Sequence, residues 1–165
     1  MRKAGLIGWM LLLLSFGAAA ETFEYADLIH PKSTLTIDAS TARSQVAIGD
    51  IAQAAIICTD GHMVCVISDA FAFAVPLKLA DQVSRWSYSG REYVLESTGR
   101  IAALGVDDDQ VRRIRSTFAG ATYLYVHSPR RGLIAVQVSS PEGVRTFVST
   151  KGIGFGADPG LRRRR

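Results

Sequence analysis

The sequence predicts an α+β domain rich in β-strands, in which one main helix, about residues 107–119, packs on a curved antiparallel sheet or a partly closed barrel. Three observations lead to this prediction. Apolar and polar residues alternate with a period of two in many segments, which is typical of strands. Short segments rich in Gly, Pro, Ser and Asp separate them, and short connections make successive strands antiparallel. One segment has helical spacing instead.

The first twenty residues have the composition of a cleaved secretory signal. Arg2 and Lys3 precede an apolar run, residues 6–16, and the small residues Ala18 and Ala20 occupy positions −3 and −1 of a cleavage site. The run is shorter than the roughly 20 apolar residues of a membrane-spanning helix, so a permanent anchor is the less favoured alternative. We expect cleavage after Ala20 and export to a periplasm, with release outside the cell as the alternative, and no transmembrane span afterwards.

Residues 21–157 are expected to form a single globular domain. Its first expected strand covers residues 34–37, after a proline. The stretch 46–57 is strand-like but interrupted by a Gly-Asp pair, and residues 51–55 are also compatible with a helical turn. In residues 71–75, Phe and Val alternate with Ala, which suits a strand buried on both faces.

The two cysteines of the chain, Cys58 and Cys65, predict a disulfide across a hairpin. A four-residue turn over residues 60–63 places them directly opposite each other, and Asp60 and Gly61 suit such a turn. A redox pair would normally have the Cys-x-x-Cys spacing, and a zinc site would need further ligands. A structural disulfide is therefore preferred to either alternative, and neither a metal nor a cofactor is expected.

A second hairpin is expected around Ser89-Gly90, with aromatic residues on both of its strands. The predicted helix follows. Asp107 is placed to cap it, Gln110 completes a capping box, and the apolar residues Val111, Ile114 and Phe118 follow at helical spacing until Gly120.

Three further strands are expected over residues 122–127, 133–138 and 144–149. The Gly-rich segment 152–156 is interpreted as a flexible exit from the last strand, with Phe155 packed against the domain.

Candidate functional residues are few, because the usual hydrolase and metalloprotease motifs do not occur. His127 is the candidate catalytic residue should the protein be a hydrolase, because it lies beside Ser128 in a strand-end loop. The candidate contacts to a ligand or partner are Arg130 and Arg131 in the same loop and the hairpin aromatics Trp86, Tyr88 and Tyr93. Packing in the core is the alternative interpretation of the aromatic residues.

The net charge of +4 comes from the two ends of the chain, because the positive charges there add up to more than that value. They are carried by Arg2 and Lys3 at one end and by Arg162, Arg163, Arg164 and Arg165 at the other. The domain between them is close to neutral, which does not suggest specific nucleic-acid binding. The tail, residues 158–165, is expected to be disordered and available to anionic surfaces.

Together, these observations favour an exported, non-catalytic binding or accessory protein of the cell envelope, whose partner is a protein or an envelope polymer. A small secreted hydrolase centred on His127 is one alternative. A structural component that assembles with itself through a strand edge is the other.

Overall fold

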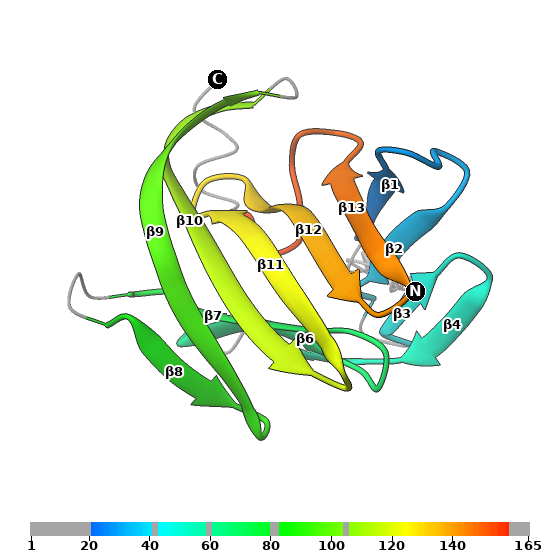
Figure 1. Cartoon of the computed structure of the whole chain (residues 1–165). Coiled ribbons are helices and arrows are strands. Elements are labelled where there is room, and N and C mark those ends of the chain that lie inside the picture. Colours follow the sequence, from blue (N-terminus) through cyan, green and yellow to red (C-terminus); the bar gives the residue numbers. More distant parts are fainter. Residues whose placement is uncertain (1–20, 41–42, 59–60, 80–82, 104–105, 159–165) are drawn as a thin grey trace, which may run out of the picture.

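The computed structural model describes residues 21–40, 43–58, 61–79, 83–103 and 106–158. Within these ranges the protein is all-β, with its strands in two antiparallel sheets (Figure 1). The predicted α+β class is therefore wrong, because the segment expected to be helical is a strand. The expected antiparallel pairing is confirmed.

The large sheet has ten strands in the order β4-β3-β2-β1-β13-β12-β11-β10-β9-β8. Successive neighbours are hairpins, so the sheet consists of two meanders joined where β1 pairs antiparallel with β13. The strands are β1 Thr22–Asp27, β2 Thr34–Asp38, β3 Gln45–Ile48, β4 Ile51–Ala54, β8 Arg85–Tyr88, β9 Arg91–Ala103, β10 Val106–Phe118, β11 Ala121–Ser128, β12 Gly132–Ser140 and β13 Gly143–Ser149.

The small sheet has three strands, β5 Ile56–Cys58, β6 Met63–Ile67 and β7 Ala72–Pro76. It follows β4 at one edge of the large sheet and precedes β8 at the other edge. Figure 1 shows β6 and β7 lying across one face of the curved large sheet. The small sheet therefore occupies the position in which the sequence predicted a helix.

Strand β10 has a spacing of buried residues that imitates a helix. Two irregularities interrupt its pairing with β9, one between Asp108 and Val111 and one between Arg113 and Ile114. The first adds a residue to β10 and the second adds one to β9. Val111 and Ile114 are three residues apart in the strand and so point to opposite faces of the sheet. Both are buried, Ile114 in the main core and Val111 in a second cluster with Val106, and their spacing is one that a helix also shows.

Gly120, expected to end the helix, instead forms the turn between β10 and β11. Ala119 and Gly120 both have positive φ, 51° and 75°. Positive φ at both central residues matches the right-handed twist of the two strands, as in a type I′ hairpin. The Ser89-Gly90 turn has the same conformation, with φ of 50° and 72°, and the second predicted hairpin is confirmed.

The predicted disulfide is confirmed. Cys58 on β5 pairs directly with Cys65 on β6, with their Cα atoms 5.0 Å apart, and the two sulfur atoms are bonded. Residue 60 of the expected turn, and residue 59 before it, lie outside the described residues.

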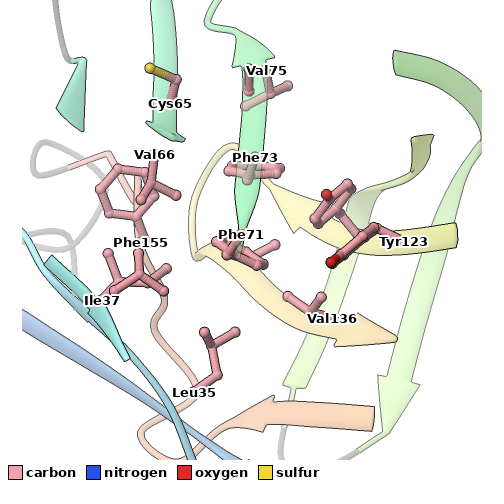
Figure 2. Close-up of a cluster of buried hydrophobic side chains, with 14 of the residues drawn as sticks. Leu35, Ile37, Cys65, Val66, Phe71, Phe73, Val75, Tyr123, Val136 and Phe155 are labelled. Carbon is pink, nitrogen blue, oxygen red and sulfur yellow. The ribbon is translucent and has the colours of Figure 1, made fainter. Parts of the chain in front are cut away.

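The main core lies between the two sheets (Figure 2). Phe73 and Val75 of β7, and Phe71 just before it, are buried in this core, as the alternating segment predicted. The large sheet contributes buried residues from several strands, including Leu35, Ile37, Tyr93, Ile114, Tyr125, Val136 and Phe147. The burial of such side chains is the main favourable contribution to folding.

Three aromatic residues of the large sheet form hydrogen bonds with the edge of the small sheet at β7. The hydroxyl groups of Tyr123 and Tyr125 donate hydrogen bonds to the carbonyl oxygens of Ala70 and Ala72, and the indole N–H of Trp86 donates to that of Ala74. These carbonyls belong to alternate residues: Ala72 and Ala74 lie in β7, and Ala70 lies just before it. An edge strand that would otherwise offer free carbonyl groups is thereby covered.

Replacing Tyr125 by Phe is expected to lower the free energy of unfolding by about 1 to 3 kcal/mol. The substitution keeps the ring but leaves the buried Ala72 carbonyl without the hydroxyl donor. Urea unfolding measures the loss. The half-buried Tyr88 supplies the control, since Tyr88→Phe is expected to change stability by less than about 0.5 kcal/mol. Equal effects of the two substitutions would contradict this role of Tyr125.

The segment after β13 is packed on the domain, so its interpretation as a flexible exit is wrong. The Phe155 ring is 2 % exposed and lies edge-on to Phe23, with the ring centroids 5.7 Å apart. The Phe155 N–H donates to the Tyr25 hydroxyl over 2.9 Å, and its carbonyl accepts from the Leu133 N–H over 2.8 Å. The expectation that Phe155 packs against the domain is confirmed.

Candidate functional site

An open cleft of about 920 Å³ lies where residues of the two sheets meet the segment after β13. Its apolar lining comes from elements far apart in sequence. The large sheet contributes Phe23, the small sheet contributes Ile57, Val64 and Val75, and the last segment contributes Phe155. A concave apolar surface of this volume is within the usual range for ligand sites.

Local structure explains why these side chains face the cleft. Phe23 and Tyr25 are the buried apolar positions of β1, because alternate residues of a strand point to the same side. Val64 and Val75 lie directly opposite each other on β6 and β7. Leu77, just after β7, also lines the cleft and is 46 % exposed.

Five polar residues complete the lining: Glu21, Ser44, Arg112, His127 and Asp158. Glu21 is the residue that the predicted cleavage would place first in the mature chain. Asp158 is the last described residue and precedes the arginine tail, whose residues 162–165 lie outside the described part of the chain.

The His127 side chain is buried in the wall of the cleft. The residue is 3 % exposed, and neither Nδ1 nor Nε2 has a hydrogen-bonding partner within the described part of the chain. Burial, and to a smaller extent the charge of Arg112, lower the pKa of His127 from 6.5 to about 3, while Asp108 acts in the opposite direction. The imidazole is therefore neutral near pH 7, with one donor and one acceptor nitrogen, both buried.

Ser128, beside His127 in sequence, has a structural role. Its hydroxyl donates to the Asp108 carboxylate over 2.6 Å and accepts hydrogen bonds from the backbone N–H groups of Arg130 and Arg131, each over 3.1 Å. These contacts hold the turn between β11 and β12. The Ser128 oxygen is thus committed to the turn and is poorly placed to act as a nucleophile.

The carboxylate of Asp108 organises the same loop. Burial raises its pKa, but hydrogen bonds from the Ser128 hydroxyl, the Gln110 N–H and Arg130 outweigh that effect, so the pKa falls below 3.8. The Arg130 guanidinium lies 3.3 Å from Asp108 and 3.0 Å from Asp109. Arg131 donates to the Gly152 carbonyl over 3.2 Å. Both candidate arginines therefore have partners within the protein.

The hairpin aromatics lie apart from the cleft lining. Tyr93 is fully buried and stacks on Trp86 with a centroid distance of 5.8 Å, and Tyr88 packs against the same core. Burial raises the pKa of Tyr93 to about 12, with Arg91 opposing the shift. The structure thus places Tyr93 in the core and leaves Trp86 and Tyr88 half-buried at its margin.

Sequence reasoning found His127 and Phe155 but not the rest of the cleft. The alternation in residues 22–27 predicts a strand with Phe23 and Tyr25 on one side, a signal that was available. Arg112 had no such signal, because its segment was assigned to a helix.

Among the described residues, no three His, Cys, Asp or Glu side chains are grouped as a metal site would require. In the same part of the chain, no helix is long and apolar enough to cross a membrane. Comparisons with protein-family models, curated proteins and solved structures find no match to the chain. The fold and the cleft therefore define the structural class of the protein. Its described part is all-β, with two packed antiparallel sheets and an open, mainly apolar cleft.

Proposed function

We propose that the protein is an exported, non-catalytic binding protein of the cell envelope, and that it holds an apolar group of its ligand in the cleft. The observation that carries this proposal is the apolar cleft with the buried, unpartnered His127 in its wall. Buried polar groups in proteins nearly always have hydrogen-bonding partners. A ligand that fills the cleft would supply one.

Two observations support export. The disulfide between Cys58 and Cys65 favours an oxidising compartment, such as a periplasm or the extracellular space. Strand β1 begins at Thr22, two residues beyond the predicted cleavage site after Ala20. Cleavage there would leave the pairing of β1 with β2 and β13 intact.

The contacts of Ser128 and the burial of His127, at the end of β11, favour a binding function over hydrolysis. The Ser128 hydroxyl is engaged by Asp108 and by two backbone N–H groups. A general base near neutral pH needs a pKa close to 7, whereas burial holds the pKa of His127 at about 3. The arrangement is suited to recognition rather than to proton transfer.

Affinity capture tests the proposal. The full chain is expressed with residues 1–20 in place, purified, sequenced from its N-terminus and used to retain molecules from an envelope extract of the source cells. We expect the N-terminal sequence to begin at Glu21. We also expect mass spectrometry to identify a ligand that Leu77→Arg loses, because an arginine at the mouth of the cleft puts a charge on its apolar wall.

Val144 provides the matched control. It is 55 % exposed on β13 and is not part of the cleft lining, so Val144→Arg should retain the ligand. Equal capture by the two arginine variants would place binding outside the cleft and contradict the proposal. An uncleaved N-terminus in a protein that stays in the cytoplasm would contradict export.

A further inference from the structure

We propose that the loop between β1 and β2, residues 28–33, inserts two aliphatic side chains, Leu28 and Ile29, into the head-group region of an anionic lipid surface. Figure 1 shows the connection between these two strands at the outside of the fold. None of the loop residues lines the cleft, so contact with lipid there does not depend on the ligand of the cleft.

Leu28 and Ile29 are large apolar side chains that the fold leaves in water. Leu28 is 53 % exposed, and Ile29, at 71 %, is the most exposed large hydrophobic residue in the described part of the chain. Single exposed hydrophobic residues are common on protein surfaces and need no explanation, but these two are consecutive. Their transfer from water to an apolar environment is favourable.

A buried carboxylate holds the loop in one conformation. One oxygen of Asp27, which is 1 % exposed, accepts hydrogen bonds from the N–H groups of Ile29 over 2.9 Å and His30 over 3.2 Å. The other oxygen accepts from the Arg145 guanidinium over 2.9 Å. The Asp27 N–H donates to the Ser33 carbonyl over 3.0 Å and closes the loop. Insertion therefore requires little further ordering of the chain.

The backbone donors at the tip of the loop are already paired, which suits an apolar environment. The Leu28 N–H donates to the Thr146 carbonyl over 2.9 Å, and the next two N–H groups donate to Asp27. The residue that follows them is Pro31, which has no N–H. An N–H group without a partner is costly away from water, so this pairing lowers the cost of moving the tip into lipid.

The small area of the tip favours a lipid surface over a protein partner. A specific protein complex buries about 800 Å² on each partner, which is far more than two side chains provide. A lipid interface is fluid and needs no matching shape, and the strength of binding grows with the buried apolar area and with attraction to anionic lipids. Two inserted side chains therefore predict a weak and reversible contact.

The charge beside the tip indicates anionic lipid. Residues 28–33 contain the exposed Lys32 and no acidic residue. The acidic residue that precedes them, Asp27, is paired with Arg145. One lysine near an anionic membrane surface strengthens binding by about fivefold. Lys32 is therefore expected to lie among the lipid head groups while the aliphatic side chains insert.

Binding to lipid vesicles tests the proposal on the full chain, expressed with residues 1–20 in place. The vesicles contain either phosphatidylcholine alone or equal parts of phosphatidylcholine and phosphatidylglycerol, and co-sedimentation over a series of lipid concentrations measures the partitioning. Ile29→Glu should weaken partitioning into the anionic vesicles by at least about tenfold, because a charge replaces an inserted side chain.

The matched control for this substitution is Ile51→Glu. Ile51 is 68 % exposed on β4, outside the loop, and its replacement adds the same charge. We expect Ile51→Glu to bind the anionic vesicles as the unsubstituted protein does. Thermal melting of each variant shows whether it is folded.

Lys32→Gln measures the contribution of the charge. It should weaken binding to the anionic vesicles by about fivefold and leave binding to phosphatidylcholine unchanged. Lys78 is also exposed, two residues after β7, so Lys78→Gln removes the same charge elsewhere and should have a much smaller effect. The terminal arginines are present in every variant and cancel in each comparison.

Tryptophan fluorescence reports insertion directly and does not require the glutamate variant to fold. The emission of Ile29→Trp should shift to shorter wavelength when anionic vesicles are added, because the indole leaves water. The emission of Ile51→Trp should not shift.

Three results would overturn the assignment of the loop to an anionic lipid surface. They are equal binding by Ile29→Glu and Ile51→Glu, an unchanged emission of Ile29→Trp on anionic vesicles, and equal partitioning of the unsubstituted protein into the two kinds of vesicle. If the vesicles were not bound but Ile29→Glu lost a protein captured from the envelope extract, the loop would belong to a protein interface instead. Capture through the cleft is tested separately by Leu77→Arg.

Discussion

Gly154→Ala is expected to lower the free energy of unfolding by about 3 to 5 kcal/mol. A Cβ atom at this position would lie 1.6 Å from the carbonyl oxygen of Leu133 and 2.7 Å from the hydroxyl of Tyr25. The first of these is a backbone atom that cannot rotate away. The segment would have to leave the domain and expose Phe155. Urea unfolding measures the loss.

The control is Gly99→Ala on β9. A Cβ at Gly99 would have no other atom within 4 Å, so stability should change by less than about 0.5 kcal/mol. If Gly154→Ala were as stable as Gly99→Ala, the close packing of the last segment on Leu133 would be contradicted. Because this segment forms part of the cleft wall, Gly154→Ala is also expected to abolish ligand capture.

Stability is expected to fall steadily as the pH is lowered from about 6.5 to about 3, because of His127. Its pKa is about 3 in the folded protein and 6.5 when unperturbed. Between these values the unfolded chain binds a proton at this residue and the folded protein does not, so acid favours unfolding. One such group changes the free energy of unfolding by about 1.4 kcal/mol per pH unit.

Between pH 6.5 and about 4, the effect of His127 on the free energy of unfolding can be distinguished from the effect of the buried carboxylates. For Asp27 and Asp108, burial raises the pKa but hydrogen bonds lower it more, so both pKa values lie below 3.8. Their contribution is present above that value and is lost only as the pH falls further. Loss of stability at pH 4.5 is therefore attributed to His127.

Urea unfolding at pH 7 and pH 4.5 checks the prediction. The unsubstituted protein should lose about 2 to 3 kcal/mol between the two, whereas His127→Phe should lose much less. His30 lies in an exposed loop, and His30→Phe should keep the full loss. The same loss in His127→Phe would show that the buried imidazole is not its source.

Hairpins were predictable from the sequence because their information is local. The alternation of residues 71–75, the Ser89-Gly90 turn and the spacing of Cys58 and Cys65 each lie within one pair of strands. Their conformations follow from period-two burial and from residues that tolerate positive φ. The structure confirms these elements.

Strand β10 was not predictable in this way. Val111 and Ile114 are buried on opposite faces of the sheet, so their three-residue spacing is compatible with either a helix or a strand covered on both faces. Pairing with β9 and β11 decides between them, and those hydrogen bonds depend on segments elsewhere in the chain. The outer part of β9, residues 96–100, is exposed throughout and carries no burial pattern.

The sequence by itself determined the export signal as a prediction, the disulfide hairpin, and most strands and turns, because each depends on residues close together in the chain. Tertiary structure alone decided the cleft. Phe23, Val64 and Phe155 meet there because β1 pairs with β13 and the small sheet crosses the large one. Arg112 faces His127 because of the register of two strands. Strand register and the packing of the two sheets depend on contacts between distant parts of the chain, and no short sequence pattern specifies those contacts.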